Sequence, residues 1–267
     1  MGFKLPLAKE VEIAAQAGYQ GIEPWIAAIQ RHVDEGRPLA DVRRRIADLG
    51  LAVEGAIGFA AWIVEDADQR AKGLEQMKRD MDLVLQLGGR RIAAPPAGAS
   101  DTGIDPRKVG ERYRAVLELG RRMGVVPQLE IWGGSKTLSR PGEAANVAIE
   151  AAHPDACLLL DVFHLYKGGA DFGGLRLLNP AALHVLHLND YPAQPSREKI
   201  TDADRVYPGD GVAPLADLLR GLREIGFSGT LSLELFNQTY WKQDPLTVAR
   251  TGLEKMRAVA AATRDSP

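Results

Sequence analysis

The sequence predicts a single (β/α)8 TIM barrel, in which a ring of parallel strands is enclosed by helices. Short β-type runs alternate with longer amphipathic helical stretches along all 267 residues, without a break in composition that would separate two domains. Most of these runs are apolar on both faces, which is typical of a parallel sheet buried under helices. The expected strand ends recur 26 to 47 residues apart, and they are Glu23, Gly55, Ala94, Glu130, Asp161, His187 and Glu234. We therefore expect one barrel domain over residues 1–267.

Seven strands are expected, each rich in apolar residues and followed by a helical stretch. In chain order they are YQGIEP (Tyr19–Pro24), LAVEGAI (Leu51–Ile57), RRIAAPP (Arg90–Pro96), VVPQLEIW (Val125–Trp132), ACLLLDVF (Ala156–Phe163), HVLHLND (His184–Asp190) and TLSLELF (Thr230–Phe236). Several intervening helical stretches end in a glycine suited to a left-handed helix C-cap. These glycines are Gly18, Gly50, Gly88, Gly124 and Gly226.

The first strand of the barrel is short or incomplete. A closed barrel needs eight strands, and the eighth should precede the helical stretch LAKEVEIAAQAG, where the sequence offers MGFKLP. Either Phe3–Leu5 forms a stub of this strand, or the true start lies upstream. A doubly wound open sheet is the alternative fold, but it usually carries a glycine-rich phosphate loop, and no GxGxxG or GxxxxGK[ST] motif follows an expected strand. The barrel is therefore favoured.

The composition is that of an ordinary globular protein, with 45% hydrophobic and 25% charged residues. The net charge is −2 and the basic residues are scattered, so we expect no nucleic-acid partner. No apolar run approaches the roughly 20 residues of a membrane span, and no signal peptide is recognisable, so we expect a cytoplasmic protein without a membrane partner. The single Cys157 excludes an intramolecular disulfide and a cysteine metal cluster, and its apolar surroundings indicate an inert buried thiol.

Ionisable residues stand at the ends of the later strands, where the active sites of parallel α/β folds lie. They are Glu130, Asp161, His187 and Glu234. A single acid in such a place could be a helix cap, but four in succession on neighbouring strands are costly to bury unless they pair or share a cation. Three carboxylates and one imidazole suit Mn²⁺, Mg²⁺ or Co²⁺, and Zn²⁺ also accepts this mixture of nitrogen and oxygen ligands. The sequence therefore predicts a divalent metal site.

With its ionisable residues in this order, the sequence resembles the sugar phosphate isomerase/epimerase superfamily, which comprises the xylose isomerase-like TIM barrels. The resemblance covers nearly the whole chain from GYQGIEPW onward, and its specific part is the pattern E…DxxH…HxxD…ELF between Glu130 and Trp241. The stretches TDADRVYPGDGVAPL and LELFNQTYW look most like the inosose (2-keto-myo-inositol) isomerase branch. The short amino terminus departs from the family pattern.

The resemblance implies a metal-dependent isomerase or epimerase of a small keto-polyol such as a keto-inositol or ketose. The metal ligands then fall on Glu130, Asp161, His187 and Glu234. Proton transfer beside a carbonyl passes through an enediolate, and Glu130 and Glu234 are the expected base and acid, in an order that the sequence leaves open. An inosose-type dehydratase would use the same site. A DNA-repair endonuclease-like barrel is disfavoured, because such barrels typically carry extra His and Asp metal ligands and a basic DNA-binding face. This chain has only five histidines and a negative net charge.

Further residues are expected around a small sugar or cyclitol substrate. By the resemblance His164 and Arg205 contact substrate; alternatively His164 orients Asp161 or Glu130, and Arg205 holds its loop through Asp204 or Asp210. Glu23 is expected to face the pocket, and Lys136 either to contact substrate or to be exposed. Trp25, Phe59, Trp62, Trp132 and Trp241 could wall the pocket against water, but each alone is more often core or interface packing. Members of the family are often dimers or tetramers, so a homo-oligomer is in keeping with the resemblance.

Overall fold

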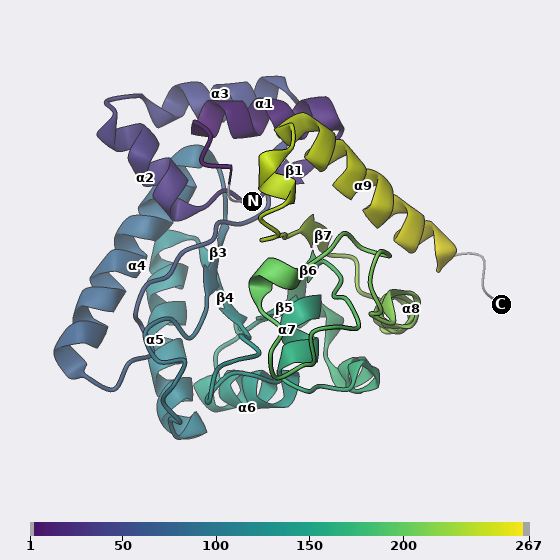
Figure 1. Cartoon of the computed structure of the whole chain (residues 1–267). Helices are drawn as coiled ribbons and strands as arrows, with labels where there is room; N and C mark the ends of the chain where they lie inside the picture. The colour runs from purple at the N-terminus through teal and green to yellow at the C-terminus, as the bar shows by residue number, and fades with distance from the viewer. Residues whose placement is uncertain (1–2, 264–267) are drawn as a thin grey trace.

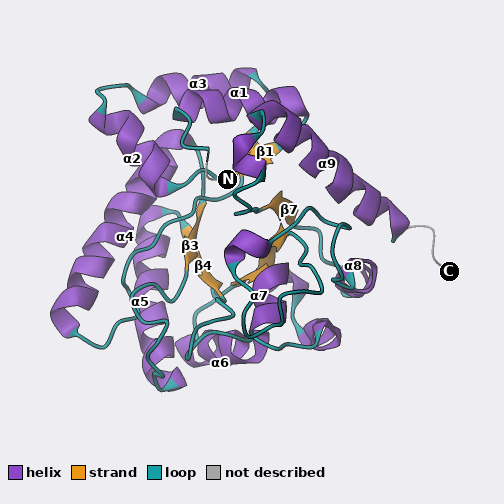
Figure 2. Cartoon of the chain, in the orientation of Figure 1, coloured by secondary structure: helices purple, strands orange, loops and turns teal. Residues whose placement is uncertain are grey.

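The structure, a computed structural model, describes residues 3–263 and shows parallel strands curled into a barrel wall (Figures 1 and 2). All paired strands are parallel and follow one another in chain order, as β1-β2 and as β3-β4-β5-β6-β7. The strands are β1 Gly21–Ile22, β2 Ala52–Val53, β3 Arg91–Ala94, β4 Val126–Glu130, β5 Leu158–Asp161, β6 Leu183–Leu188 and β7 Thr230–Leu233. The predicted barrel class and all seven predicted strands are confirmed.

Helices connect the strands and cover the outer face of the wall, as Figure 2 shows. They are α1 Leu7–Ala17, α2 Ile26–Asp34, α3 Leu39–Asp48, α4 Ala67–Leu87, α5 Pro106–Met123, α6 Pro141–Ala151, α7 Val162–Lys167, α8 Leu215–Glu224 and α9 Pro245–Ala262. The five glycines expected at helix ends all have a positive φ, which glycine adopts without steric cost. Within residues 3–263, no helix combines the length and the apolar character needed to span a membrane.

The two sheets join on one side and stay apart on the other. Between β2 and β3, Ala56 donates its N–H to the carbonyl of Arg91 at 3.1 Å, and Ala93 donates to the carbonyl of Ala56 at 2.9 Å. On the far side, the described residues provide no backbone hydrogen bond between β7 and β1. Residues 3–6 form no strand, so the expected stub at Phe3–Leu5 is wrong. The wall therefore has an open seam between β7 and β1.

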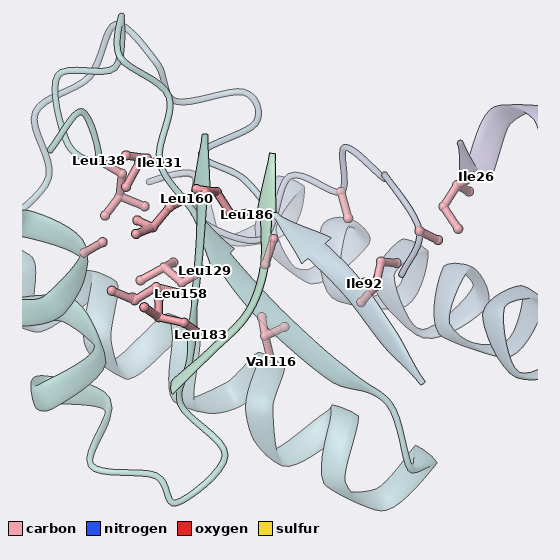
Figure 3. Close-up of a cluster of buried hydrophobic side chains, with 14 of the residues drawn as sticks. Ile26, Ile92, Val116, Leu129, Ile131, Leu138, Leu158, Leu160, Leu183 and Leu186 are labelled. Atoms are coloured by element: carbon pink, nitrogen blue, oxygen red, sulfur yellow. The ribbon is translucent and has the colours of Figure 1, made fainter. Parts of the chain in front are cut away.

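Alternation along β5 explains the three leucines of LLLD. Leu158 and Leu160 belong to the large core between the sheet and the helices, and Figure 3 shows both in one cluster with Val116 of α5. Leu159 instead packs inside the barrel with Val185, Ala93 and Ile57. Because successive side chains point to opposite faces, the residue two positions beyond Leu159 also points inward, and that residue is Asp161. β6 repeats this pattern with Val185 and His187. The inward-facing apolar residues Leu159 and Val185 thus place Asp161 and His187 on the inner face of the barrel, two positions further along each strand.

We predict that Gly120→Ala destabilises the fold, because α5 approaches β4 through this glycine. An added Cβ would lie 2.3 Å from the carbonyl oxygen of Val125 and 2.7 Å from Cδ of Pro127. Alanine favours a helix over glycine by about 1 kcal/mol, but overpacking against backbone costs about 1–3 kcal/mol, so the free energy of unfolding should fall. Gly142→Ala in α6 is the control, since a Cβ there meets nothing within 4 Å. Equal unfolding midpoints for the two variants in urea would contradict this packing.

Candidate metal and catalytic site

Three of the four predicted ligands converge at the carboxyl ends of the strands. Asp161, His187 and Glu234 each offer one ligand atom, and these atoms lie within 4.8 Å of one another. Nδ1 of His187 is 3.4 Å from Oε2 of Glu234 and 3.9 Å from Oδ2 of Asp161. Asp161 and His187 are register partners of β5 and β6, which brings their side chains to the same height in the barrel. We call these three residues the ligand trio.

His187 is oriented by a carboxylate on each side of its ring. Nε2 contacts Oε2 of Glu23 at 3.2 Å, so Nδ1 faces Asp161 and Glu234, and Nδ1 has no hydrogen-bond partner within the described chain. Burial acts to lower the pKa of His187, but the charge of Glu234 and the hydrogen bond with Glu23 outweigh it and raise the pKa well above its ordinary value. Glu23 therefore faces the interior, as expected, and holds the imidazole from the side opposite the trio.

Glu130 lies next to the ligand trio at the end of β4. Its side chain is buried, and Oε2 finds no hydrogen-bond partner among the described residues. Burial raises the pKa of Glu130 to about 8; the nearby charge of His187 opposes this rise, whereas Glu234 and Asp161 add to it. In the metal-free protein Glu130 thus favours its protonated form. A divalent cation beside it would reverse this preference, because a positive charge stabilises the carboxylate.

Glu234 follows β7 and has the opposite protonation preference. Burial acts to raise its pKa, but the charges of His187 and Arg205 hold it well below the usual range. Arg205 donates from one guanidinium nitrogen to Oε2 of Glu234 and to Oδ2 of Asp161, each at 2.8 Å. Two carboxyl groups at one site are therefore driven apart in pKa, which is how a single site provides both a proton acceptor and a proton donor.

Arg205 is the main positive charge at the mouth of the barrel. Its side chain is 1% exposed, and its guanidinium lies over the rings of Phe163 and Phe236 at 4.7 and 4.9 Å. Its loop partner is Asp202, which accepts from Nε at 3.1 Å. The alternative partners expected from the sequence, Asp204 and Asp210, instead bond Thr201 and Lys255. Arg205 thus pairs with two members of the ligand trio and fixes its own loop through Asp202.

The two carboxylate oxygens of Asp161 accept different hydrogen bonds. Oδ1 accepts the backbone N–H of His164 at 2.8 Å, which caps the amino end of α7. Oδ2 accepts from Arg205 and, at 2.8 Å, from the side-chain amide of Asn189. The spacing DxxH is therefore that of a helix N-cap and its third helical residue, and it fixes where His164 lies.

His164 is buried between two hydrogen-bond donors. The N–H of Gly133 points at Nδ1 at 3.2 Å, and the guanidinium of Arg205 lies 3.2 Å from Nε2. Burial lowers the pKa of His164, and Arg205 adds to this effect, whereas Asp161 opposes it. A neutral imidazole accepts at only one nitrogen, so only one of the two contacts is a hydrogen bond. His164 therefore borders Arg205 and the helix cap of Asp161.

Aromatic rings follow the ends of β1, β2, β4 and β7. Trp25 packs on Phe59 and Phe236, with centroids 5.5 and 5.9 Å apart, and Phe59 lies 6.0 Å from Trp132. Trp62 belongs to the core, the alternative considered for it: it is fully buried and donates to the carbonyl of Pro95 at 2.8 Å. We call Trp25, Phe59, Trp132 and Phe236 the aromatic arc.

The structure does not bring Lys136 into the network around the ligand trio. Lys136 is exposed on the loop after β4, where its backbone N–H donates to Ser100. Asp190 accepts backbone N–H bonds from Tyr191, Gly209, Gly211 and Ala213, so it holds the loop that follows β6.

Sequence reasoning missed two buried amides. Asn189 donates to Asp161 and accepts the N–H of Phe163, and Gln128 lies inside the barrel with neither side-chain amide atom bonded to a described residue. Asn189 lies two positions from His187, and Gln128 lies two positions from Glu130. Because side chains two positions apart on a strand point to the same face, this spacing was the available signal that both amides face the barrel interior.

The donor set fits a divalent cation. Asp161, Glu234 and the adjacent Glu130 offer carboxylate oxygens, and His187 offers a nitrogen without a hydrogen-bond partner among the described residues. Buried acids of this kind need a compensating positive charge. Asp161 Oδ2 and Glu234 Oε2, the oxygens nearest to Nδ1 of His187, are the same two that Arg205 holds. A cation there would take over the charge compensation that Arg205 now gives.

The fold and the site place the protein among parallel α/β barrels with an acidic, imidazole-bearing mouth. The chain belongs to the xylose isomerase-like TIM barrel family, whose model matches residues 11–259. The solved structure of the IOLI protein with a binding zinc atom has a TM-score of 0.90 and covers 98% of this chain and 95% of that chain at 21% identity, which shows the shared fold. The resemblance seen in the sequence is thereby confirmed.

Two of the curated relatives have names that give different activities. An inosose isomerase from Halalkalibacterium halodurans is 32% identical over 126 residues, which are 47% of this chain and 44% of that protein. A 3-dehydroshikimate dehydratase from Pseudomonas putida is 24% identical over 259 residues, which are 97% of this chain and 40% of that protein. In both matches the chain spans less than half the length of the relative.

We predict that Arg205→Met destabilises the metal-free protein by about 3–5 kcal/mol, the usual cost of leaving buried charges unpaired. The loss arises because Asp161 and Glu234 both depend on the same guanidinium nitrogen. Chemical unfolding in the presence of a chelator measures it. Arg44→Met removes an exposed pair with Asp41 and should cost about 0–1 kcal/mol. A similar small change in both variants would show that Arg205 is not needed to compensate the acids.

Proposed function

We propose that the protein is a divalent-metal-dependent isomerase or epimerase of a small keto-polyol, with a keto-inositol as the best single candidate. The observation that carries the proposal is the convergence of Asp161, His187 and Glu234, with Glu130 beside them, at one mouth of the barrel. The inosose isomerase names among the relatives support the substrate class. A cyclitol ring also offers an apolar C–H face, which suits the aromatic arc.

The ligand trio would hold the metal through Asp161, Nδ1 of His187 and Glu234, and the unpartnered Oε2 of Glu130 is available as a further ligand. Such a metal supplies Lewis-acid stabilisation of a substrate carbonyl and its enediolate. Glu23 would keep Nδ1 of His187 directed at the trio by holding Nε2. Mn²⁺, Mg²⁺, Co²⁺ and Zn²⁺ all accept this donor set, so metal analysis decides among them.

Two carboxyl groups would move the proton. Glu234, whose carboxyl group is held ionised, would accept a proton from the substrate carbon. Glu130, buried beside the ligand trio at the end of β4, would carry a proton to the neighbouring carbon. Arg205 and His164 would lie where a developing oxyanion needs hydrogen-bond donors.

Dehydration is the second candidate function, and the 3-dehydroshikimate dehydratase match along 97% of this chain favours it. A dehydratase removes the same kind of proton but then expels a β-hydroxyl group as water. Proton NMR in D₂O separates the two reactions on a keto-inositol. Isomerisation keeps the molecular formula and incorporates deuterium from solvent, whereas dehydration yields an unsaturated product that has lost water.

We predict that Asp161→Asn lowers the affinity for a divalent cation by at least about 100-fold, since a neutral amide replaces a ligand charge. Asparagine also caps helices well, so α7 should stay in place. Titration calorimetry of the chelator-treated protein with MnCl₂ and ZnCl₂ measures the affinity. Asp202→Asn is the matched control, because Asp202 pairs with Arg205 but lies outside the trio. Tight binding by both variants would place the metal elsewhere.

We predict that Glu130→Gln and Glu234→Gln each lower kcat/KM by about 10²–10⁴, the usual contribution of a positioned acid or base. Glu234→Gln should also abolish exchange of the substrate C–H with D₂O, because the first proton transfer is lost. Glu130→Gln should retain that exchange while forming little product. The exposed Glu198→Gln is the control. Turnover close to that of the unaltered protein in both site variants would rule out this pair.

A further inference from the structure

Gln128 of β4 is buried inside the barrel, and both polar atoms of its side chain lack a hydrogen-bond partner in the described chain. It stands two positions before Glu130, so it points to the same inner face of the wall. Burying an amide without a hydrogen bond is unfavourable, and such a group in a native protein is normally satisfied by an ordered water or a ligand. Gln128 has no part in the proton transfer proposed above. Its amide therefore indicates an occupant of the barrel interior.

A second unpartnered atom lies close to this amide. Oε1 of Glu23 is buried and bonds to nothing within residues 3–263, whereas Oε2 of the same carboxylate contacts Nε2 of His187 at 3.2 Å. A Cβ added to Gly55 would lie 2.5 Å from Oε1 of Glu23 and 3.7 Å from Nε2 of Gln128. An acceptor and a donor thus approach one point inside the barrel without bonding to each other.

The part of the wall between these two side chains carries small residues. Gly55 follows β2 and has no side chain. Ala93 of β3 is the register partner of Gln128 and offers only a methyl group to the barrel interior. Because the interior of such a barrel is normally filled by bulky side chains, these two positions leave space between Glu23 and Gln128. We call the space bordered by Glu23, Gly55, Ala93 and Gln128 the polar cell.

We propose that the polar cell binds at least one internal water molecule, and that Gln128 acts through this water as a positioning residue for the metal site. The water accepts from Nε2 of Gln128 and donates to Oε1 of Glu23. Two hydrogen bonds of about 3 Å in series join atoms up to about 6 Å apart. This matches a donor and an acceptor that approach one point without bonding to each other.

Water fits the polar cell better than a substrate hydroxyl does. Gln128 lies two residues from Glu130 toward the amino end of β4, so it is deeper in the barrel than the candidate ligands. Both of its amide atoms and Oε1 of Glu23 are closed off from solvent. A substrate held at the mouth does not reach this depth, whereas internal waters characteristically bond buried polar groups that would otherwise be unsatisfied.

The water would act on the candidate metal site through Glu23. One oxygen of this carboxylate holds the ring of His187, and the ring is fixed only as firmly as the carboxylate itself. A hydrogen bond at Oε1 restrains the carboxylate from the other side. Groups that orient a metal-bound imidazole typically change the metal affinity by about 10–100-fold. This step rests on the proposed function, because it requires His187 to bind a metal.

Gln128→Met tests the positioning role, because methionine keeps the length of the side chain and removes both polar atoms. In titration calorimetry of the chelator-treated protein with CoCl₂, the affinity should fall about 10–100-fold. The visible absorption spectrum of the bound Co²⁺ should also shift, since the imidazole is held less firmly. Leu159→Met is the matched control, because it changes a side chain of the inner apolar cluster and removes no polar group. An unchanged affinity and spectrum in Gln128→Met, or equal changes in the two variants, would overturn the positioning role.

A crystal structure of the unaltered, metal-free protein tests the water site without any variant. We expect electron density for an ordered water within hydrogen-bond distance of Oε1 of Glu23 and Nε2 of Gln128. A direct hydrogen bond between the two side chains, or a polar cell without density, would overturn the proposal. A protein that binds no divalent cation would instead overturn the proposed function, and the density in the polar cell would still decide whether the water site exists.

Discussion

The arrangement depends on the compensation of buried acids at the mouth of the barrel. Glu130, Asp161 and Glu234 are buried or nearly so, and each such charge costs several kcal/mol unless a cation or hydrogen-bond donors offset it. Arg205 and His187 provide that positive charge in the metal-free protein. The same electrostatics separate the pKa values of Glu130 and Glu234 in opposite directions. The network that compensates the charges of the buried acids therefore also gives Glu130 and Glu234 different pKa values.

Asp161 links the architecture to this network. One of its oxygens begins α7 by accepting the N–H of His164, and the other meets Arg205 and Asn189 inside the barrel. The strand that ends at Asp161 is in turn set by its leucines, which alternate between the helix-facing core and the barrel floor. Small errors in the packing of β5 would thus move a ligand, a helix start and His164 together.

The open seam bears on the site as well as on the fold. Glu23 follows β1 at the edge of the open seam and holds the ring of His187, so the least enclosed part of the wall orients a member of the ligand trio. The family match shows which fold the chain has, while β7 and β1 show where this wall lacks a strand pair. One carboxylate, Glu23, therefore connects the edge of the open seam to the orientation of the imidazole.

The sequence by itself determined the order of strands and helices and placed Glu130, Asp161, His187 and Glu234 at strand ends, because apolar periodicity and glycine caps are local signals. It could not determine which side chains contact one another. Only the tertiary structure decided that Arg205 bridges Asp161 and Glu234 and that Glu23 holds the ring of His187. These contacts join residues as many as 164 positions apart. Their geometry follows from barrel curvature and loop packing, which no local sequence pattern encodes.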